Sequence, residues 1–216
     1  MSVCKTLTAI TFSVFLVTAT GASAFAEGFI DLYGGSARTS DSYVKVDIFN
    51  FPAPDKSATR NISFDDSVSV GVRAGGWSSS LSWLGGCVDL SYFKADGNGM
   101  NATVIPLSAM LMFRYPAFKS SEYPNGRLQP YVAFGPGLFF YHATVDFQPE
   151  LQREVTENSF SAGIDARAGL TWMFSEHWGF FGEYRYTYFK IDEDFLDNFS
   201  ATMETSHWLL GLSYRF

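Results

Sequence analysis

The sequence predicts an all-β fold, namely an eight-stranded antiparallel up-and-down transmembrane β-barrel. Three observations lead to this prediction: about eight segments of alternating polarity, an aromatic content of 18%, and an apolar stripe at the end of the chain. The stripe has a period of two, which places its members on one face of a strand. It consists of Trp208, Leu210, Leu212, Tyr214 and Phe216. A last strand that faces lipid can end on an exposed aromatic residue in this way.

The segments of alternating polarity follow one another along the chain with little helical periodicity. They span residues 28–37, 64–76, 83–94, 102–115, 128–141, 159–174, 178–189 and 203–216. In the second segment, for example, Val68 and Val70 alternate with Ser69 and Gly71. Each segment is therefore predicted to be a strand with one apolar and one polar face.

The fifth segment, 128–141, is ambiguous because both of its faces are apolar. It also contains Pro130 and Pro136, which lack the N–H group that a central strand needs. We expect Pro136 to lie at a bulge beside Gly135 and Gly137.

An even number of strands puts both chain ends on one side of the membrane, which we assign to the periplasm. The outer loops are then roughly 38–63, 95–101, 142–158 and 190–202, and the periplasmic connections are 77–82, 116–127 and 175–177. Two of the three periplasmic connections are short. Short turns on one side and longer loops on the other are typical of transmembrane barrels.

The first 26 residues, 1–26, are predicted to be a cleaved signal peptide. Lys5 supplies the positive charge, and residues 7–20 form the apolar core of the signal. Small residues allow cleavage after Ala24 or after Ala26, and we place the cut after Ala26. The run is short for a spanning helix of roughly 20 residues, which disfavours a membrane anchor. Residues 27–216 then form a single barrel domain.

Charge, aromatic content and cysteine count narrow the class of protein. The chain has 216 residues and a net charge of -7, which argues against a nucleic-acid partner. Its aromatic residues suit the girdles that barrels place at both membrane interfaces. Cys87 is the single cysteine after the predicted signal, so residues 27–216 contain no internal disulfide.

Alternation alone does not decide which face meets lipid, because a soluble lipocalin-like barrel would put its apolar face inside. Three observations favour lipid outside. Tyr184, Tyr186 and Tyr188 lie near a strand end on the apolar face, and the terminal Phe216 belongs to the apolar set. The polar faces mix both signs of charge with small residues, as a narrow, filled interior requires.

The polar faces predict a charge network inside the barrel. Its members are Asp31, Arg73, Asp89, Arg114, Asp165, Arg167, Glu183, Arg185 and Arg215. Five cations and four anions nearly balance, as a self-neutralising plug needs, whereas a strongly selective pore would carry one sign in excess. We expect Asp165 and Arg167 to pair with Glu183 and Arg185 across two neighbouring strands. An ion or proton path through the same residues stays open as the functional alternative.

The sequence predicts no catalytic residues, no cofactor and no metal site. Ser206 and His207 are adjacent, so a strand points them to opposite faces and they cannot form a nucleophile–base pair. His142 has no serine two positions away, and His177 lies in a predicted periplasmic turn. Two groups of acids in outer loops are expected to be solvated loop charge, with divalent cations bridging to lipopolysaccharide phosphates as the alternative. They are Asp192, Glu193, Asp194 and Asp197 in one loop, and Asp65 and Asp66 near another.

Several segments resemble the outer membrane protein β-barrel family, the small OmpA-like and OmpX-like barrels of Gram-negative bacteria. They are residues 83–93, 128–137, 165–170 and 181–186. The resemblance implies a location in the outer membrane, in contact with its lipids and with lipopolysaccharide. It also implies that the stripe from Trp208 to Phe216 is the signal read by the barrel assembly machinery during insertion.

The resemblance defines a fold and a location more closely than a function. We expect a structural or surface-interaction barrel whose lumen is filled by side chains, present as a monomer. The alternative is a narrow, passive, porin-like channel for small solutes or ions. A lipid-modifying enzyme is disfavoured by the histidine positions described above.

Overall fold

A computed structural model describes residues 25–48, 56–98, 100–146, 154–193 and 198–216. Ten strands account for most of them. They are β1 (Phe25–Thr39), β2 (Ser42–Ile48), β3 (Lys56–Ile62), β4 (Ser67–Ser78), β5 (Leu84–Gly97), β6 (Met100–Arg114), β7 (Leu128–Asp146), β8 (Glu154–Met173), β9 (Trp178–Glu193) and β10 (Asn198–Arg215). The described residues include no helix that is long and apolar enough to cross a membrane.

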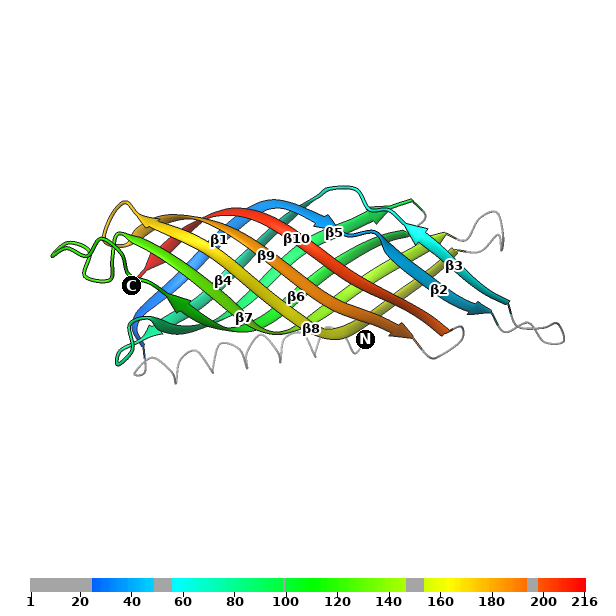
Figure 1. Cartoon of the computed structure of the whole chain (residues 1–216), viewed down its shortest axis with the longest axis horizontal. Coiled ribbons are helices and arrows are strands. Elements are labelled where there is room, and N and C mark those ends of the chain that lie inside the picture. The colour runs from blue at the N-terminus through cyan, green and yellow to red at the C-terminus, as the bar shows by residue number, and fades with distance from the viewer. Residues whose placement is uncertain (1–24, 49–55, 99, 147–153, 194–197) are drawn as a thin grey trace, which may run out of the picture.

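Eight of these strands, β1 and β4 to β10, form a closed antiparallel barrel (Figure 1). Each strand pairs with the next along this order, and pairing of β1 with β10 closes the cylinder. β2 and β3 form a hairpin that lengthens the wall, because β2 pairs with β10 beyond the end of β1. The predicted eight-stranded up-and-down barrel is therefore confirmed.

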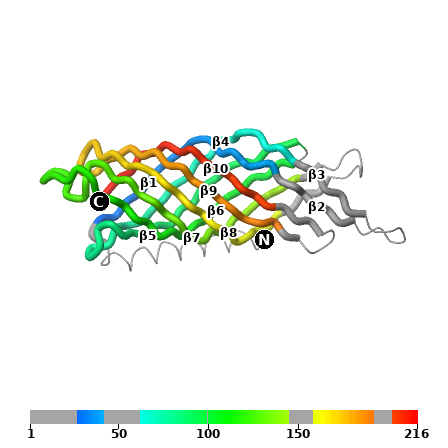
Figure 2. Tube along the Cα trace, viewed as in Figure 1, coloured from blue at the N-terminus to red at the C-terminus, as the bar shows by residue number. Residues whose placement is uncertain are grey.

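Both described ends of the chain lie at the same end of the barrel, where β1 begins and β10 ends (Figures 1 and 2). The backbone of Gly28 donates a 2.7 Å hydrogen bond to Phe216 and accepts one of 3.0 Å from it. The connections between β4 and β5, β6 and β7, and β8 and β9 lie at this end as well. We call it the periplasmic end, following the assignment of both chain ends to the periplasm made from the sequence.

Strand pairing extends well into the regions predicted to be outer loops, which corrects that prediction. β7 continues to Asp146 and β8 begins at Glu154, inside the expected loop 142–158. β2 and β3 occupy much of the expected loop 38–63. These residues gain nothing from lipid, but pairing satisfies their backbone groups wherever the wall continues.

The predicted bulge at Pro136 is wrong, because β7 keeps an unbroken register with β8 through this residue. Pro136 stands opposite Ile164, and its neighbours Gly135 and Gly137 stand opposite Asp165 and Gly163. The missing N–H instead coincides with a gap in the pairing of β6 with β7. The register of the two strands is the same before and after this gap. A barrel strand tolerates the proline because one ladder bond is omitted and the register is kept.

The wall that crosses the membrane is apolar outside and polar inside. Outward side chains such as Leu32 and Leu210 are 66% and 75% exposed in the absence of lipid. At the periplasmic end, outward aromatic residues form a girdle that includes Trp178, Tyr214 and Phe216. This arrangement is the one expected of a transmembrane barrel, in which lipid covers the outer face.

The polarity of the two faces is reversed in the outer part of the barrel. A cluster of apolar residues is buried inside it: Ala37, Ile62, Phe64, Phe93, Ala95, Met100, Ala102, Val104, Phe139, Tyr141, Ala143, Phe189, Ile191 and Met203. Several of their neighbours in the sequence point outward and are polar, as with Lys94 beside Phe93 and Lys190 beside Phe189, whereas Leu138 and Phe140 beside Phe139 are still apolar. The outer part therefore has the apolar core and polar surface of a water-soluble barrel.

Candidate functional site

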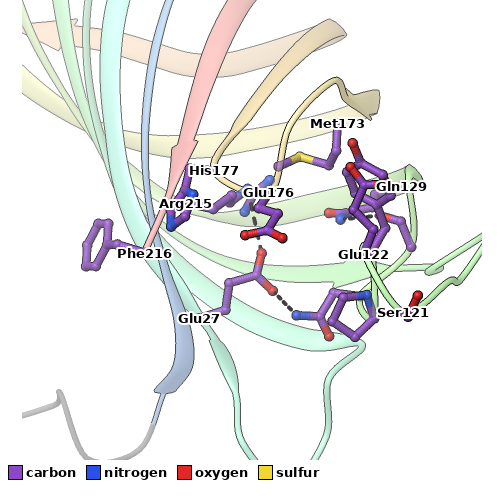
Figure 3. Close-up of a pocket in the computed structure, with 13 residues that line it drawn as sticks. Glu27, Ser121, Glu122, Gln129, Met173, Glu176, His177, Arg215 and Phe216 are labelled. Carbon is purple, nitrogen blue, oxygen red and sulfur yellow. Dashed lines mark hydrogen bonds and ion pairs between the residues drawn. The ribbon is translucent and has the colours of Figure 1, made fainter.

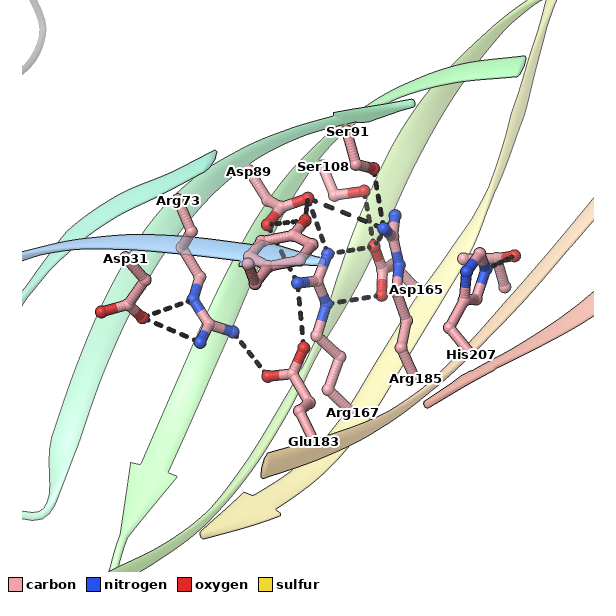
Figure 4. Close-up of polar contacts among 12 residues, drawn as sticks. Asp31, Arg73, Asp89, Ser91, Ser108, Asp165, Arg167, Glu183, Arg185 and His207 are labelled. Carbon is pink, nitrogen blue, oxygen red and sulfur yellow. Dashed lines mark hydrogen bonds and ion pairs between the residues drawn. The ribbon is translucent and has the colours of Figure 1, made fainter. Parts of the chain in front are cut away.

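The lumen at mid-barrel is filled by a layer of seven charged side chains, shown in Figure 4. The layer comprises Asp31 on β1, Arg73 on β4, Asp89 on β5, Asp165 and Arg167 on β8, and Glu183 and Arg185 on β9. Each residue occupies an inward position of its strand, since alternate residues face the lumen. All seven are at most 4% exposed, so this layer leaves little room for water.

Arg167 is the hub of this charge layer. Its Nε and Nη2 donate hydrogen bonds of 3.0 Å and 2.9 Å to the two carboxylate oxygens of Asp165. Its Nη1 donates to Asp89 at 2.9 Å and to Glu183 at 3.2 Å. One guanidinium thus joins three carboxylates, as its planar fork of donors permits.

Arg73 connects the hub to the periplasmic side of the layer. Its Nη1 donates a 2.7 Å hydrogen bond to Glu183, and its Nε donates one of 2.9 Å to Asp31. The Tyr131 hydroxyl also donates to Glu183, at 2.7 Å. Glu183 therefore lies between Arg73 and Arg167 and is bonded to both.

Arg167 and Arg185 stand directly opposite each other on β8 and β9, which alone would be repulsive. Asp165 compensates, because it accepts from Arg167 and, at 2.8 Å, from Nη2 of Arg185. The cross-strand pairs expected from the sequence, Arg185 with Asp165 and Arg167 with Glu183, are both present.

Neutral donors complete the layer. The Tyr33 hydroxyl donates to both oxygens of Asp89, at 2.7 Å and 2.8 Å. Ser108 donates to Asp165 at 2.8 Å, and Ser91 accepts from Arg185 at 2.7 Å. Buried charges are tolerated when their remaining lone pairs and protons find partners, as most of these do.

A second, smaller group of charges lies at the periplasmic end. Arg114 donates hydrogen bonds of 2.7 Å and 3.1 Å to the two oxygens of Glu27 and stacks over Trp77 with its guanidinium carbon 4.2 Å from the ring centre. Arg215 approaches the same carboxylate at a longer distance, 3.8 Å from its Nε. The nine charges named from the sequence thus divide into the charge layer and this periplasmic pair of arginines.

Glu27 is a member of the network that the sequence analysis missed, because it was considered only as the residue after the predicted cleavage site. Its alternation with Phe29 and Asp31 on one strand face was the available signal. With Glu27 included, five inward acids face five inward arginines.

The apolar cluster lies inside the barrel on the outer side of the charge layer. Phe139 and Phe189 stack across it with ring centres 4.5 Å apart. Below them, His207 packs edge-on against Phe93 at 4.9 Å and is fully buried. Ser206 points the opposite way and contacts the Tyr184 hydroxyl at 2.8 Å, so the two adjacent residues lie on opposite faces.

The terminal apolar stripe lies on the outer face of β10. Trp208, Leu210, Leu212, Tyr214 and Phe216 are all exposed in the absence of lipid. Leu209, by contrast, is buried in the lumen with Tyr33 and Phe181. The recognition of this stripe by an assembly machinery stays a prediction.

A pocket of about 390 Å³ opens at the periplasmic mouth (Figure 3). The β6–β7 connection, the β8–β9 turn and the end of β10 line it. Charged residues at this mouth include Glu27, Glu122, Glu176 and Arg215.

A closed wall that is apolar where lipid would cover it, around a lumen filled with paired charges, defines an integral β-barrel membrane protein. The sequence model of the family described as "Outer membrane protein beta-barrel domain" matches residues 12–216. The chain belongs to this family, which confirms the resemblance noted above, and it is a protein of the Gram-negative outer membrane.

Solved structures with the same fold include Neisserial surface protein A and OprG from Pseudomonas aeruginosa. The first is 15% identical with a TM-score of 0.53, over 88% of this chain and 97% of that chain. The second is 16% identical with a TM-score of 0.51, over 89% of this chain and 97% of that chain. A comparison with the curated proteins gave no match. At such identities the likeness concerns the fold alone.

Proposed function

We propose that the protein is a closed outer-membrane barrel with a structural or surface-interaction role, and that it does not serve as a diffusion channel. The observation that carries this proposal is the charge layer centred on Arg167. Three acids surround this one guanidinium, at hydrogen-bond distances of 2.9–3.2 Å. A solute or ion could pass this level only by breaking several charge-assisted hydrogen bonds at once, and such bonds are the strongest in proteins.

The apolar cluster supports the proposal independently. Phe93, Phe139 and Phe189 are fully buried within the outer part of the barrel. An ion that reached this level would lose most of its water and meet mainly aromatic rings, with few polar groups such as Ser69 and His207 in place of that water. The charge layer and the apolar cluster therefore both support the proposal of a closed lumen, by different chemistry.

The outer part of the wall supports the surface role. The β2–β3 hairpin carries pairing beyond the end of β1, and β7 to β10 extend with it. This gives the protein a raised rim supported by an apolar core. We propose that this rim meets the environment and that the lower wall contacts membrane lipid and lipopolysaccharide, in a monomer without enzymatic activity.

Single-channel recording in planar lipid bilayers tests the closed lumen. The native protein should give no stable conductance steps, with a porin of known conductance as the control for insertion. Phe139→Ala should stay closed as well, because the charge layer remains, whereas Phe139→Ala combined with Arg167→Ala should conduct. Large, stable steps from the native protein would overturn the proposal in favour of the narrow channel.

A further inference from the structure

The periplasmic pocket combines one buried cation with exposed acids. Arg215 lines the pocket and is 6% exposed. Within the part of the chain that the structure describes, its Nε and Nη1 have no hydrogen-bond partner, and its ion pair with Glu27 is long, at 3.8 Å. An arginine so deeply buried and so incompletely bonded is costly unless an acceptor reaches it.

Glu27 does not satisfy Arg215, because its carboxylate is already engaged elsewhere. Both of its oxygens accept from Arg114, and one also accepts from the Asn125 side chain at 2.8 Å. The bidentate geometry fixes this carboxylate on Arg114. The guanidinium of Arg215, which lines the pocket, therefore retains donors that no acceptor among the described residues satisfies.

The entrance of the pocket carries the opposite charge. Glu122 and Glu176 are exposed, come from the β6–β7 connection and the β8–β9 turn, and line the same pocket as Arg215 (Figure 3). A simple anion would meet these two carboxylates before it reached Arg215. A simple cation would be attracted to the entrance but repelled from the interior, so neither matches the site fully.

We propose that this pocket binds a small zwitterion, namely a free amino acid or a short peptide with both ends free. Its carboxylate accepts hydrogen bonds from Arg215, and its ammonium group lies between Glu122 and Glu176. The volume of about 390 Å³ falls near the lower end of the roughly 300–1,000 Å³ typical of small-molecule pockets, which suits a ligand of this size. The proposal does not depend on the closed lumen, because the ligand binds at the mouth without crossing the barrel.

Calorimetric titration of the refolded barrel in detergent micelles tests the proposal with three matched peptides. Trialanine carries both charges, N-acetyl-trialanine lacks the ammonium group, and trialanine amide lacks the carboxylate. Trialanine should bind, and loss of the carboxylate should weaken binding about tenfold or more, because it removes charge-assisted hydrogen bonds to a buried group. Loss of the ammonium group should weaken binding by about twofold to fivefold for each exposed ion pair removed.

Variants at the exposed entrance keep the test independent of folding. Glu176→Gln and Glu122→Gln should each weaken trialanine binding about twofold to fivefold and leave N-acetyl-trialanine binding unchanged. Asp65→Asn, an exposed acid at the opposite end of the barrel, is the matched control and should change nothing. Equal binding of the three peptides, acetate binding as tightly as trialanine, or no heat at roughly 10 mM trialanine would each overturn the proposal.

Discussion

Replacing Arg167 with methionine should lower the free energy of unfolding by about 3–5 kcal/mol, the usual cost of removing one partner from a buried charge network. Counting charges in the charge layer shows why this residue is sensitive. The layer holds four acids, namely Asp31, Asp89, Asp165 and Glu183, and three arginines, namely Arg73, Arg167 and Arg185. Without Arg167, four carboxylates share two guanidinium groups, and Asp89 keeps only the 3.9 Å approach of Arg185 as a cationic neighbour.

Glu183→Gln makes the matched comparison. It leaves three acids with three arginines, and a glutamine oxygen can still accept from Arg73 and Arg167. The expected cost is therefore about 1–3 kcal/mol, which corresponds to weakened hydrogen bonds without an uncompensated charge. Glu183→Ala should cost more than Glu183→Gln, because it also removes the acceptor of the Tyr131 hydroxyl at 2.7 Å.

The measurement is a urea unfolding titration in lipid vesicles, followed by tryptophan fluorescence and by the electrophoretic shift between folded and unfolded barrel. Asp89→Asn supplies a further check. It should destabilise the native protein but stabilise the Arg167→Met variant, because there it removes a carboxylate that has lost its main partner. Two outcomes would refute this explanation. One is an equal loss of unfolding free energy in Arg167→Met and Glu183→Gln. The other is that Asp89→Asn destabilises the Arg167→Met variant as it does the native protein.

Three further predictions concern the wall and the closures. Leu111→Arg should destabilise the barrel in lipid by roughly 2–4 kcal/mol if the site meets the bilayer midplane. Thr103 lies on the same face of β6 but beyond the apolar wall, so Thr103→Arg should cost less than about 1 kcal/mol in the same titration. Similar costs for the two variants would contradict the polarity reversal. Deleting Phe216 or replacing it with Asp should reduce insertion, and normal amounts of heat-modifiable barrel in the truncated variant would argue against the assembly signal. Phe139→Ala should cost about 3–5 kcal/mol through the cavity it leaves in the apolar cluster, and an unchanged unfolding midpoint would show that the cluster is not a packed core.

Much of the fold was predictable because a period of two is a strong signal wherever one face meets lipid. It identified the eight barrel strands and the inward direction of residues such as Arg73 and Arg167. It failed at the outer ends of the strands, where the apolar residues move from the outer face to the inner face. In β7, Leu138 faces outward and Phe139 inward, so the two patterns meet within one strand and both faces read as apolar.

The charge network was predictable as a set of inward residues, but its connections were not. Alternation shows that Asp165 and Arg167 share a face, yet it does not show that Arg167 also reaches Asp89 on a strand across the lumen. Such contacts depend on how far long side chains extend across a narrow barrel. Tyr33 shares a strand face with Asp31, but the alternation did not show that its hydroxyl is a partner of Asp89. The periplasmic pocket arises from two connections and the end of β10, whose mutual position follows only from the closed barrel.

The strands are also longer than a membrane requires. The reversal of polarity determines how much of that length can lie in the hydrocarbon. β7 has 19 residues and β8 has 20, whereas roughly 9–11 residues of a tilted strand cross a bilayer. In a thicker bilayer, the barrel cannot simply bury more of its wall, because Lys94 and Lys190 would enter the hydrocarbon. The lipid must instead thin around the protein, or the long lysine side chains must extend towards the interface. The level at which the outward residues become polar, and not the strand tips, therefore sets the depth of the protein in the membrane.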